Sequence, residues 1–301
     1  MNSLLKLYEE CRLCPRMCGA DRRKTKGACG EGTGIRAARA ALHFWEEPCL
    51  SDSGGSGAIF FSGCTLRCCY CQNYMISQSG LGREISEDRL YEIMLELQDK
   101  GAQNIDLITA TQFIPSLIPV LERARPELHI PIVYNCGGYE RAETLRLLEG
   151  YVDIYLPDLK YHSSEVSGRY SAAPDYFPYA KEAIKEMIRQ CGKPVFDEKG
   201  RLQKGVIIRH MVLPGQKEDS IRLLEWIRDE LPKGGFLISL MSQYTPFFRA
   251  KEHPEIDRRL TSYEYDRVLK AALSMGIDLG YMQERSSARE EYTPLFDLEG
   301  L

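Results

Sequence analysis

The sequence predicts an α/β fold in which parallel strands and helices alternate to close into a barrel or most of one. From residue 58 onward, short apolar runs alternate with longer segments of helical periodicity, as in consecutive βα units. Six or seven such units follow one another, and 301 residues is a common length for one α/β barrel domain. We therefore expect one large core and no second domain of comparable size.

Four closely spaced cysteines lie in residues 1–33, ahead of the expected barrel. They are Cys11, Cys14, Cys18 and Cys29; the first two have the spacing C-x2-C, and the last lies in a glycine-rich segment. Four thiolates can hold a closed zinc site or an iron–sulfur cluster. We expect a cysteine-rich metal-binding segment here, with zinc and iron–sulfur equally open and two disulfides or free thiols as alternatives. The basic run 22–26 is most simply a solvated loop.

Residues 34–57 are expected to connect this segment to the barrel, which with its C-terminal extension would occupy residues 58–301. A short amphipathic stretch is followed by glycine and serine residues, which mark a connection and not a regular element. His43, Trp45, Glu46 and Glu47 could line the rim of a site, but a histidine beside aromatic residues is more often a packed side chain.

The apolar runs that predict strands cover residues 58–62, 105–110, 131–134, 152–156, 206–212, 236–240 and 277–282. Helical periodicity predicts helices near residues 86–100, 113–124, 140–149, 176–191, 217–231 and 262–275. The first of these helices begins with an N-cap residue, Ser86, and two carboxylates follow in its first turn, where they complement the helix dipole.

Polar side chains follow the predicted strands at their carboxyl ends, where the ligands of a parallel barrel gather. They are Cys64, Thr109, Thr111, Gln112, Asn135, Cys136, Asp158, Lys160, Arg209, His210, Gln243, Tyr244, Gln283, Glu284 and Arg285. We therefore expect one rim that combines cysteines, a carboxylate, a lysine and a histidine.

Five of these residues could instead have a purely structural role. Asp158 and Lys160 are two positions apart and could form a structural ion pair. His210 could be a packed histidine, because strand alternation places it on the side of Ile208, opposite Arg209. The amides of Asn135 and Gln112 could simply close turns or cap helices.

The composition is that of an ordinary globular protein and excludes several classes of function. A net charge of −4 and a pI near 5.9 give no sequence-wide attraction to nucleic acid or to an anionic membrane. The N-terminal apolar run is too short for a secretory signal, and no stretch approaches the roughly 18 apolar residues of a membrane span. We expect a cytoplasmic protein, where clustered cysteines favour metal or redox chemistry.

The most informative stretch is FFSGCTLRCCYCQN, residues 60–73. Cys64, Cys68 and Cys71 have the spacing C-x3-C-x2-C, with no fourth cysteine at a matching distance. Three thiolates suit an iron–sulfur cluster that keeps one coordination position open for a ligand other than protein. Cys69 does not fit this spacing and is more simply a small buried side chain.

These residues resemble the signature of radical S-adenosylmethionine (SAM) enzymes, including the aromatic Tyr70 before the last cysteine. The wider resemblance is to the pyruvate formate-lyase activating enzyme-like branch of that family. It rests on the segments CRLCPRMCG, FFSGCTLRCCYCQN, TATQFIP, VDIYLPDLKY and IIRHMVLPG, which are distributed along the chain from Cys11 to about Gln243.

The resemblance implies a partial (β/α)6 barrel and a 4Fe-4S cluster on Cys64, Cys68 and Cys71, with SAM bound to the fourth iron. Reductive cleavage of SAM would give a 5′-deoxyadenosyl radical that abstracts hydrogen from a substrate. By the same resemblance Tyr70 would lie near the adenine, and Asp158 with Lys160 near the SAM carboxylate beside a monovalent cation site. His210 would match a histidine close to SAM, and Lys160 and His210 are the expected catalytic residues.

The sequence departs from the family pattern at three places. No Gly-Gly-Glu segment for the SAM amino group is evident, and Thr109, Thr111 and Gln112 lie where it is expected, so they are the candidate cofactor contacts. Asn135-Cys136 stands where the family has an Asp-Thr pair that helps to form the cation site. The four N-terminal cysteines precede the SAM motif, whereas the extra clusters of activating enzymes usually follow it.

Three functions remain open at this point. The first is hydrogen abstraction from a glycine of a glycyl-radical partner enzyme, with reduced flavodoxin or a ferredoxin-type protein as electron donor. The second is a radical SAM reaction on another protein, RNA or a small molecule. The third is a non-catalytic iron–sulfur or zinc protein for binding or electron transfer, against which the three-cysteine count argues.

Overall fold

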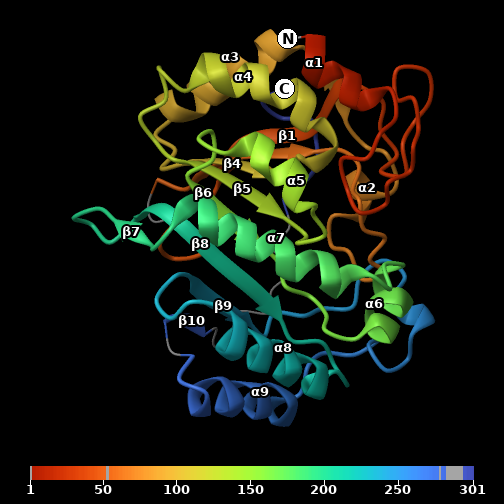
Figure 1. Cartoon of the computed structure of the whole chain (residues 1–301), viewed down its shortest axis with the longest axis vertical. Coiled ribbons are helices and arrows are strands. Elements are labelled where there is room, and N and C mark those ends of the chain that lie inside the picture. The colour runs from red at the N-terminus through yellow and green to blue at the C-terminus, as the bar shows by residue number, and fades with distance from the viewer. Residues whose placement is uncertain (1, 52–53, 278, 283–293) are drawn as a thin grey trace.

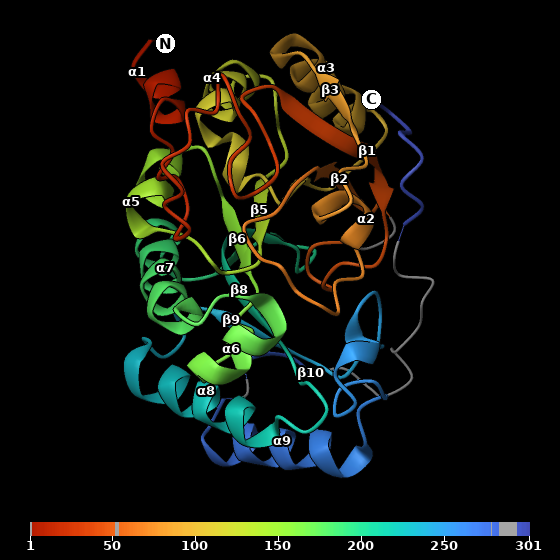
Figure 2. The same ribbon diagram turned by 90° about the vertical axis from the view of Figure 1, so that its right-hand side faces the viewer.

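The computed structural model describes residues 2–51, 54–277, 279–282 and 294–301. Within them, one ten-stranded sheet has the order β10-β9-β8-β6-β5-β4-β2-β1-β3, with β7 (Val195–Phe196) paired to β8. The parallel strands are β2 (Ser56–Phe61), β4 (Ile105–Ile108), β5 (Ile132–Cys136), β6 (Ile154–Pro157), β8 (Leu202–Met211), β9 (Leu237–Met241) and β10 (Gly280–Met282). The predicted α/β partial barrel is confirmed: the sheet is mostly parallel and open, as Figures 1 and 2 show.

The predicted helices are present, with ends that differ by a few residues. They are α3 (Glu87–Asp99), α4 (Ile114–Ala124), α5 (Ala142–Leu145), α7 (Tyr176–Cys191), α8 (Lys217–Glu230) and α9 (Ser262–Ser274). Short segments that the sequence did not predict are α1 (Asn2–Leu5), α2 (Tyr74–Ser77) and α6 (Ser164–Ser171). The Ser86 side chain accepts a hydrogen bond from the Arg89 amide, as an N-cap does. Helices α3, α4, α7, α8 and α9 pack through their apolar faces on the outer face of the curved sheet.

Strand alternation separates two apolar layers. In β5, Tyr134 belongs to the outer layer that the helices cover, whereas Val133 belongs to an inner cluster with residues of β6, β8 and β9. In β8, Ile208 faces outward and Ile207 faces inward. Side chains of the same parity as Val133 and Ile207 therefore point to the inside of the partial barrel.

Residues 34–57 are more structured than a connection. Residues 35–43 form β1 (Ile35–His43), which pairs antiparallel with β2, and β3 (Arg83–Ile85) pairs with its outer edge. The run of small alanines gives β1 little apolar alternation, which explains why the sequence pattern did not reveal it.

The segment after β1 enters the inside of the barrel. Cys49 and Leu50 pack in the inner cluster, the Leu202 amide donates to the Cys49 carbonyl, and the Asn104 side chain donates to the Leu50 carbonyl at 2.8 Å. Asn104 precedes β4 and Leu202 begins β8, so this segment closes the barrel at the amino ends of its strands.

The N-terminal segment is anchored on the barrel through buried side chains. Tyr8 is fully buried and hydrogen-bonds Ser116 of α4 at 3.0 Å. Arg22 is 2% exposed and donates to the carbonyls of Glu31 and Gln112. The prediction of a solvated loop is therefore wrong for Arg22, because the backbone carbonyls around it satisfy its guanidinium.

No helix among the described residues is both long enough and apolar enough to cross a membrane.

Candidate active site

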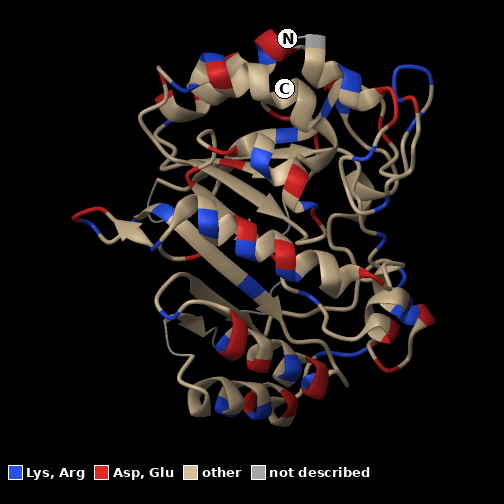
Figure 3. Ribbon diagram, in the orientation of Figure 1, with Lys and Arg blue, Asp and Glu red and all other residues tan. Residues whose placement is uncertain are grey.

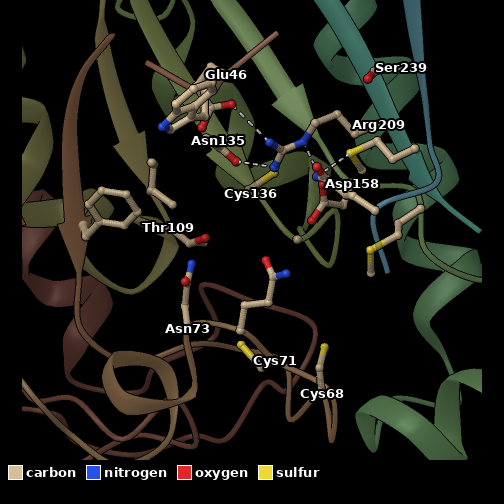
Figure 4. Close-up of a pocket in the computed structure, with 18 of the residues that line it drawn as sticks. Glu46, Cys68, Cys71, Asn73, Thr109, Asn135, Cys136, Asp158, Arg209 and Ser239 are labelled. Atoms are coloured by element: carbon tan, nitrogen blue, oxygen red, sulfur yellow. Dashed lines mark hydrogen bonds and ion pairs between the residues drawn. The ribbon is translucent and has the colours of Figure 1, made fainter. Parts of the chain in front are cut away.

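A cavity of about 770 Å³ lies at the carboxyl ends of the parallel strands, a size within the range of small-molecule sites. Loops after β2, β4 and β6 line it, together with the ends of β5, β8 and β9. Cys68 and Cys71 lie on one side, and Glu46, Asn135, Asp158 and Arg209 lie on the other (Figure 4). The cavity thus has a sulfur side and a charged side.

The sulfur side contains Cys64, Cys68 and Cys71, all of which line the cavity. Removal from water raises the pKa of Cys64 to about 12 and that of Cys71 to about 11, and in both cases the neighbouring Cys68 contributes. Lys160 acts in the opposite direction on all three thiols but does not offset burial, so they favour the protonated state. Iron would supply the missing positive charge, so this donor set fits an iron–sulfur cluster.

Hydrogen bonds reach all three of these sulfurs, and Cys71 Sγ pairs with the Ser77 hydroxyl at 3.4 Å. The Ser171 hydroxyl donates to Cys68 Sγ at 2.9 Å, and the Leu66 amide donates to Cys64 Sγ at 3.4 Å. Cys69 is buried but does not line the cavity, in agreement with its interpretation as a packed side chain.

The loop that carries Cys64 is held in place by close packing. Gly63 has φ +80°, and a Cβ at this position would lie 2.5 Å from Glu31 Cγ and 2.8 Å from the Cys29 carbonyl oxygen. The side-chain amide of Gln112 donates to the Ser62 carbonyl at 2.7 Å and to the Gly63 carbonyl at 3.2 Å. Only glycine combines this φ with this close approach.

The N-terminal cysteines pack directly behind that loop. The Cys64 amide donates to the Cys29 carbonyl at 3.3 Å, and Arg16 Nε donates to the Thr65 carbonyl at 2.9 Å. Cys11, Cys14 and Cys29 are buried, whereas Cys18 is exposed. Burial raises the pKa of Cys14 to about 12, with a smaller contribution from Cys29.

Among the described residues, no three His, Cys, Asp or Glu side chains are placed to hold a single metal ion. A tetrahedral zinc site would need Zn–S distances of about 2.3 Å, so no preformed zinc geometry is present at the N-terminal cysteines. In a 4Fe-4S cluster each thiolate binds its own iron, and the sulfur atoms stand farther apart.

Arg209 is the centre of the charged side. Its guanidinium donates to Asn135 Oδ1 at 2.7 Å, to Asp158 Oδ1 at 2.9 Å and to Glu46 Oε2 at 3.3 Å (Figure 4). Burial opposes its charge, but Asp158, Glu47, Glu46 and Asp106 outweigh burial and raise the pKa of Arg209. Arg209 is therefore a permanent cation in this wall.

Asp158 and Lys160 form an ion pair at 2.7 Å. Burial raises the pKa of Asp158, but Arg209 and Lys160 more than offset this effect and lower the pKa overall. For Lys160, burial is outweighed chiefly by Asp158, and the pKa is raised. Both side chains are therefore charged and both line the cavity, so an ion pair and a place in the site coexist.

Five candidate residues besides the cysteines line the cavity: Tyr70, Thr109, Asn135, Asp158 and Lys160. The hydroxyl of Tyr70 is hydrogen-bonded to Tyr161 at 2.5 Å, and its ring packs edge-on against Tyr244.

Thr111, Gln112 and His210 do not line the cavity. Thr111 donates to Glu140 at 2.8 Å, and Gln112 contacts the loop carbonyls described above. His210 is 2% exposed and faces the outer layer, where its Nδ1 lies 2.6 Å from the Leu159 carbonyl oxygen. Gln243 also lines the cavity, whereas Gln283, Glu284 and Arg285 lie outside the described residues.

Sequence reasoning gave little weight to Glu46 and Glu47, which line the cavity from the segment after β1. It missed Asp106 altogether, a 1% exposed side chain in β4. The sequence signal that could have revealed Asp106 is its position inside the apolar run 105–108. A carboxyl group is seldom buried in a strand unless it is paired with another group.

Comparisons with known proteins agree with this geometry. The family model of the radical SAM superfamily matches residues 58–227. The uncharacterized protein MJ0674 of Methanocaldococcus jannaschii is 29% identical over 284 residues, which are 91% of this chain and 78% of that protein.

Solved structures resemble the fold at low sequence identity. Methylornithine synthase (PylB) matches with a TM-score of 0.51 and 15% identity over 91% of this chain and 69% of its own. HydG from Carboxydothermus hydrogenoformans matches with a TM-score of 0.52 and 12% identity over 78% of this chain and 56% of its own. The chain spans 46% of SuiB from Streptococcus suis, which matches with a TM-score of 0.46 and 13% identity. Because the family model covers more than half of the sequence, this chain belongs to the radical SAM superfamily.

Proposed function

We propose that this chain cleaves SAM reductively at a 4Fe-4S cluster held by Cys64, Cys68 and Cys71. Membership of the superfamily implies the cluster and SAM. The observation that carries the proposal is that the three cysteines share one cavity with a wall of charged groups. When bound, the cluster and SAM supply an electron and a 5′-deoxyadenosyl radical, which abstracts hydrogen from the substrate.

The chain's own residues bind and tune the cluster in this proposal. Hydrogen bonds from Ser171 to Cys68 and from the Leu66 amide to Cys64 place donors against the sulfurs. Such donors stabilise electron density on sulfur and raise the reduction potential of a cluster.

We propose that Tyr70, Thr109, Asn135 and Asp158 contact SAM, and that Lys160 takes part in catalysis by binding an anionic group. All five line the cavity, which supports these roles. The ion pair with Asp158 keeps Lys160 charged and fixes its position.

For Gln112 and His210 we propose roles through the backbone that they hold, and for Thr111 a role through Glu140, to which it donates. Gln112 ties the carbonyls of Ser62 and Gly63, which precede Cys64. His210 contacts the carbonyl of Leu159, between Asp158 and Lys160. Gln112 and His210 would each position a neighbour that lines the cavity.

The finer assignment that we propose is to the pyruvate formate-lyase activating enzyme-like branch, with a glycine of a glycyl-radical enzyme as the hydrogen donor. The five sequence segments quoted above support it. A radical SAM reaction on another protein, RNA or a small molecule is the second candidate, favoured by the absence of an evident Gly-Gly-Glu segment. A glycyl radical detected by electron paramagnetic resonance after mixing with a partner protein would separate the two.

We further propose that Cys11, Cys14, Cys18 and Cys29 hold a second metal centre, and that residues 1–33 act as a separate metal-binding unit ahead of residues 34–57, which include β1, and of the rest of the barrel. Their packing against the Cys64 loop supports a role in cluster stability or in electron delivery from a flavodoxin or ferredoxin-type donor. A monovalent cation near Asp158 and a cytoplasmic location belong to the same proposal.

The test is anaerobic reconstitution with iron and sulfide, followed by dithionite and SAM. We expect 5′-deoxyadenosine from the wild type and none from Cys71→Ala. Cys11→Ala should retain part of the activity if the N-terminal centre is only structural. A fully reconstituted wild type that forms no 5′-deoxyadenosine refutes the proposal.

A further inference from the structure

The charged side of the cavity carries more carboxyl groups than cations. Four carboxyl groups form what we call the acidic wall: Glu46, Glu47, Asp106 and Asp158. Among the described residues, the cations of this region are Arg209, which acts on all four of these groups, and Lys160, which pairs with Asp158. Burial raises the pKa of Glu47 and of Asp106, so these two carboxyl groups avoid an uncompensated charge by holding a proton, and a further positive charge beside them would let them ionise.

Two buried oxygens of the wall lack a hydrogen-bond partner within the described residues. They are Oε2 of Glu47, which is 7% exposed and lines the cavity, and Oδ1 of Asp106, which is 1% exposed and lies behind it. The other oxygen of Asp106 accepts from Asn135 at 3.2 Å. A buried acceptor that faces a cavity without a protein donor points to a donor from a ligand.

Rigid elements hold these groups. Asp106 and Asn135 belong to neighbouring strands, and the segment of Glu46 and Glu47 is anchored by Cys49 and Leu50 in the inner cluster. The wall faces the cysteines across the cavity, as Figure 4 shows for Glu46 and Arg209. The wall therefore lies on the side of the cavity away from the proposed cluster.

We infer that the acidic wall binds a positively charged nitrogen group of the substrate, an alkylammonium or an alkylguanidinium, through Glu47. This inference rests on the proposed function, because it assigns the substrate class of the same cavity. Both groups supply a positive charge together with N–H donors for the unpartnered oxygens. A bare metal ion fits less well, since no three carboxyl, imidazole or thiol groups of the described residues converge to hold one.

The pKa of Glu47 is consistent with this inference. Burial raises it to about 7, although Arg209 acts in the opposite direction. A cation bound beside Glu47 would favour its ionised form, so binding would restore the ordinary charge of the group.

The inference is tested by the binding of four probes of similar shape to the reconstituted protein: n-butylammonium, n-butylguanidinium, butyramide and butyrate. Binding is followed by saturation-transfer NMR with SAM absent and with SAM present. We expect the two cations to bind more tightly than butyramide and butyrate. Glu47→Gln should weaken the cations about tenfold, because it removes one charge-assisted contact.

Two variants make the result interpretable. Glu182→Gln makes the same chemical change at an exposed position of α7 and should leave binding as in the wild type. Asp106→Asn replaces the second carboxyl group of the wall that has an unpartnered oxygen and should also weaken the cations, so the test stands if one wall variant fails to fold.

Three results would overturn the inference: no binding of either cation, equal or tighter binding of butyramide or butyrate, or cation binding that is unchanged in both wall variants. Displacement of the cations by SAM would also overturn it, since the wall would then serve the sulfonium. The proposed function fails separately, by the absence of 5′-deoxyadenosine from wild-type protein whether or not the probes bind.

Discussion

Replacing Glu47 by glutamine should stabilise the protein, and more so at high pH than at low pH. Glu47 is 7% exposed, and Oε2 has no partner among the described residues. Burial raises its pKa from 4.5 to about 7, so the folded state holds a proton that the unfolded chain releases above pH 4.5. Glu47 therefore destabilises the folded state increasingly as the pH rises from 4.5 towards 7.

The size of the effect follows from the two pKa values. Between pH 5 and pH 8, a shift from 4.5 to about 7 costs the wild type about 2.5 kcal/mol in the free energy of unfolding. Glutamine does not titrate, so the variant escapes this cost. For a chain of this size, about 2.5 kcal/mol corresponds to roughly 5 °C in Tm.

The assay is thermal unfolding followed by circular dichroism at pH 5 and pH 8, for wild type, Glu47→Gln and Glu182→Gln. We expect the Tm difference between Glu47→Gln and wild type to widen in favour of the variant at pH 8, whereas Glu182→Gln follows wild type at both values. A difference that stays constant, or that narrows at pH 8, would refute the reasoning about Glu47.

Three further predictions follow from local contacts. Glu264→Gln should lower the free energy of unfolding at pH 7 by about 1–2 kcal/mol, because Glu264 closes the capping box of α9 and pairs with Arg258 at 2.7 Å. Arg258 lowers the pKa of Glu264, so this stabilisation should be lost in urea titrations as the pH falls below the unfolded value of 4.5. Gly63→Ala should reduce the iron bound on reconstitution, whereas Gly192→Ala, with φ +69° and nothing within 4 Å of its Cβ, should not; equal iron contents would contradict the packing account of the Cys64 loop. Cys69→Ser should bind as much iron as wild type in a colorimetric assay, and a loss would make Cys69 a ligand.

The sequence predicted the barrel well because the parallel strands are buried on both faces and read as short apolar runs. All six residues of β2 are buried, for example, and the run 58–62 was recognised from its hydrophobicity. β1 was missed because its alanines and arginines show no clear alternation of apolar and polar residues. Its pairing with β2 depends on the tertiary structure, which the local sequence does not reveal.

For the site, spacing predicted the cysteines and strand ends predicted Thr109, Asn135, Asp158 and Lys160 as neighbours of one cavity. Such residues can be found because parallel strands place their carboxyl ends together. Glu46 and Glu47 could not be found in this way, since they reach the cavity from the opposite end of the strands, on a segment whose insertion depends on packing of Cys49 and Leu50. His210 was ambiguous because a single strand position decides between the inner and outer layer.

The central claim is that Cys64, Cys68 and Cys71 hold a cluster with one iron open to SAM. It is tested most directly by electron paramagnetic resonance of the dithionite-reduced, reconstituted protein before and after addition of SAM, in a Cys11→Ala background that removes a proposed ligand of the second centre. We predict a 4Fe-4S signal whose g-values shift on addition of SAM, and its loss in Cys11→Ala/Cys71→Ala. A signal that SAM leaves unchanged would contradict the account, because a cluster with four protein ligands has no position for SAM.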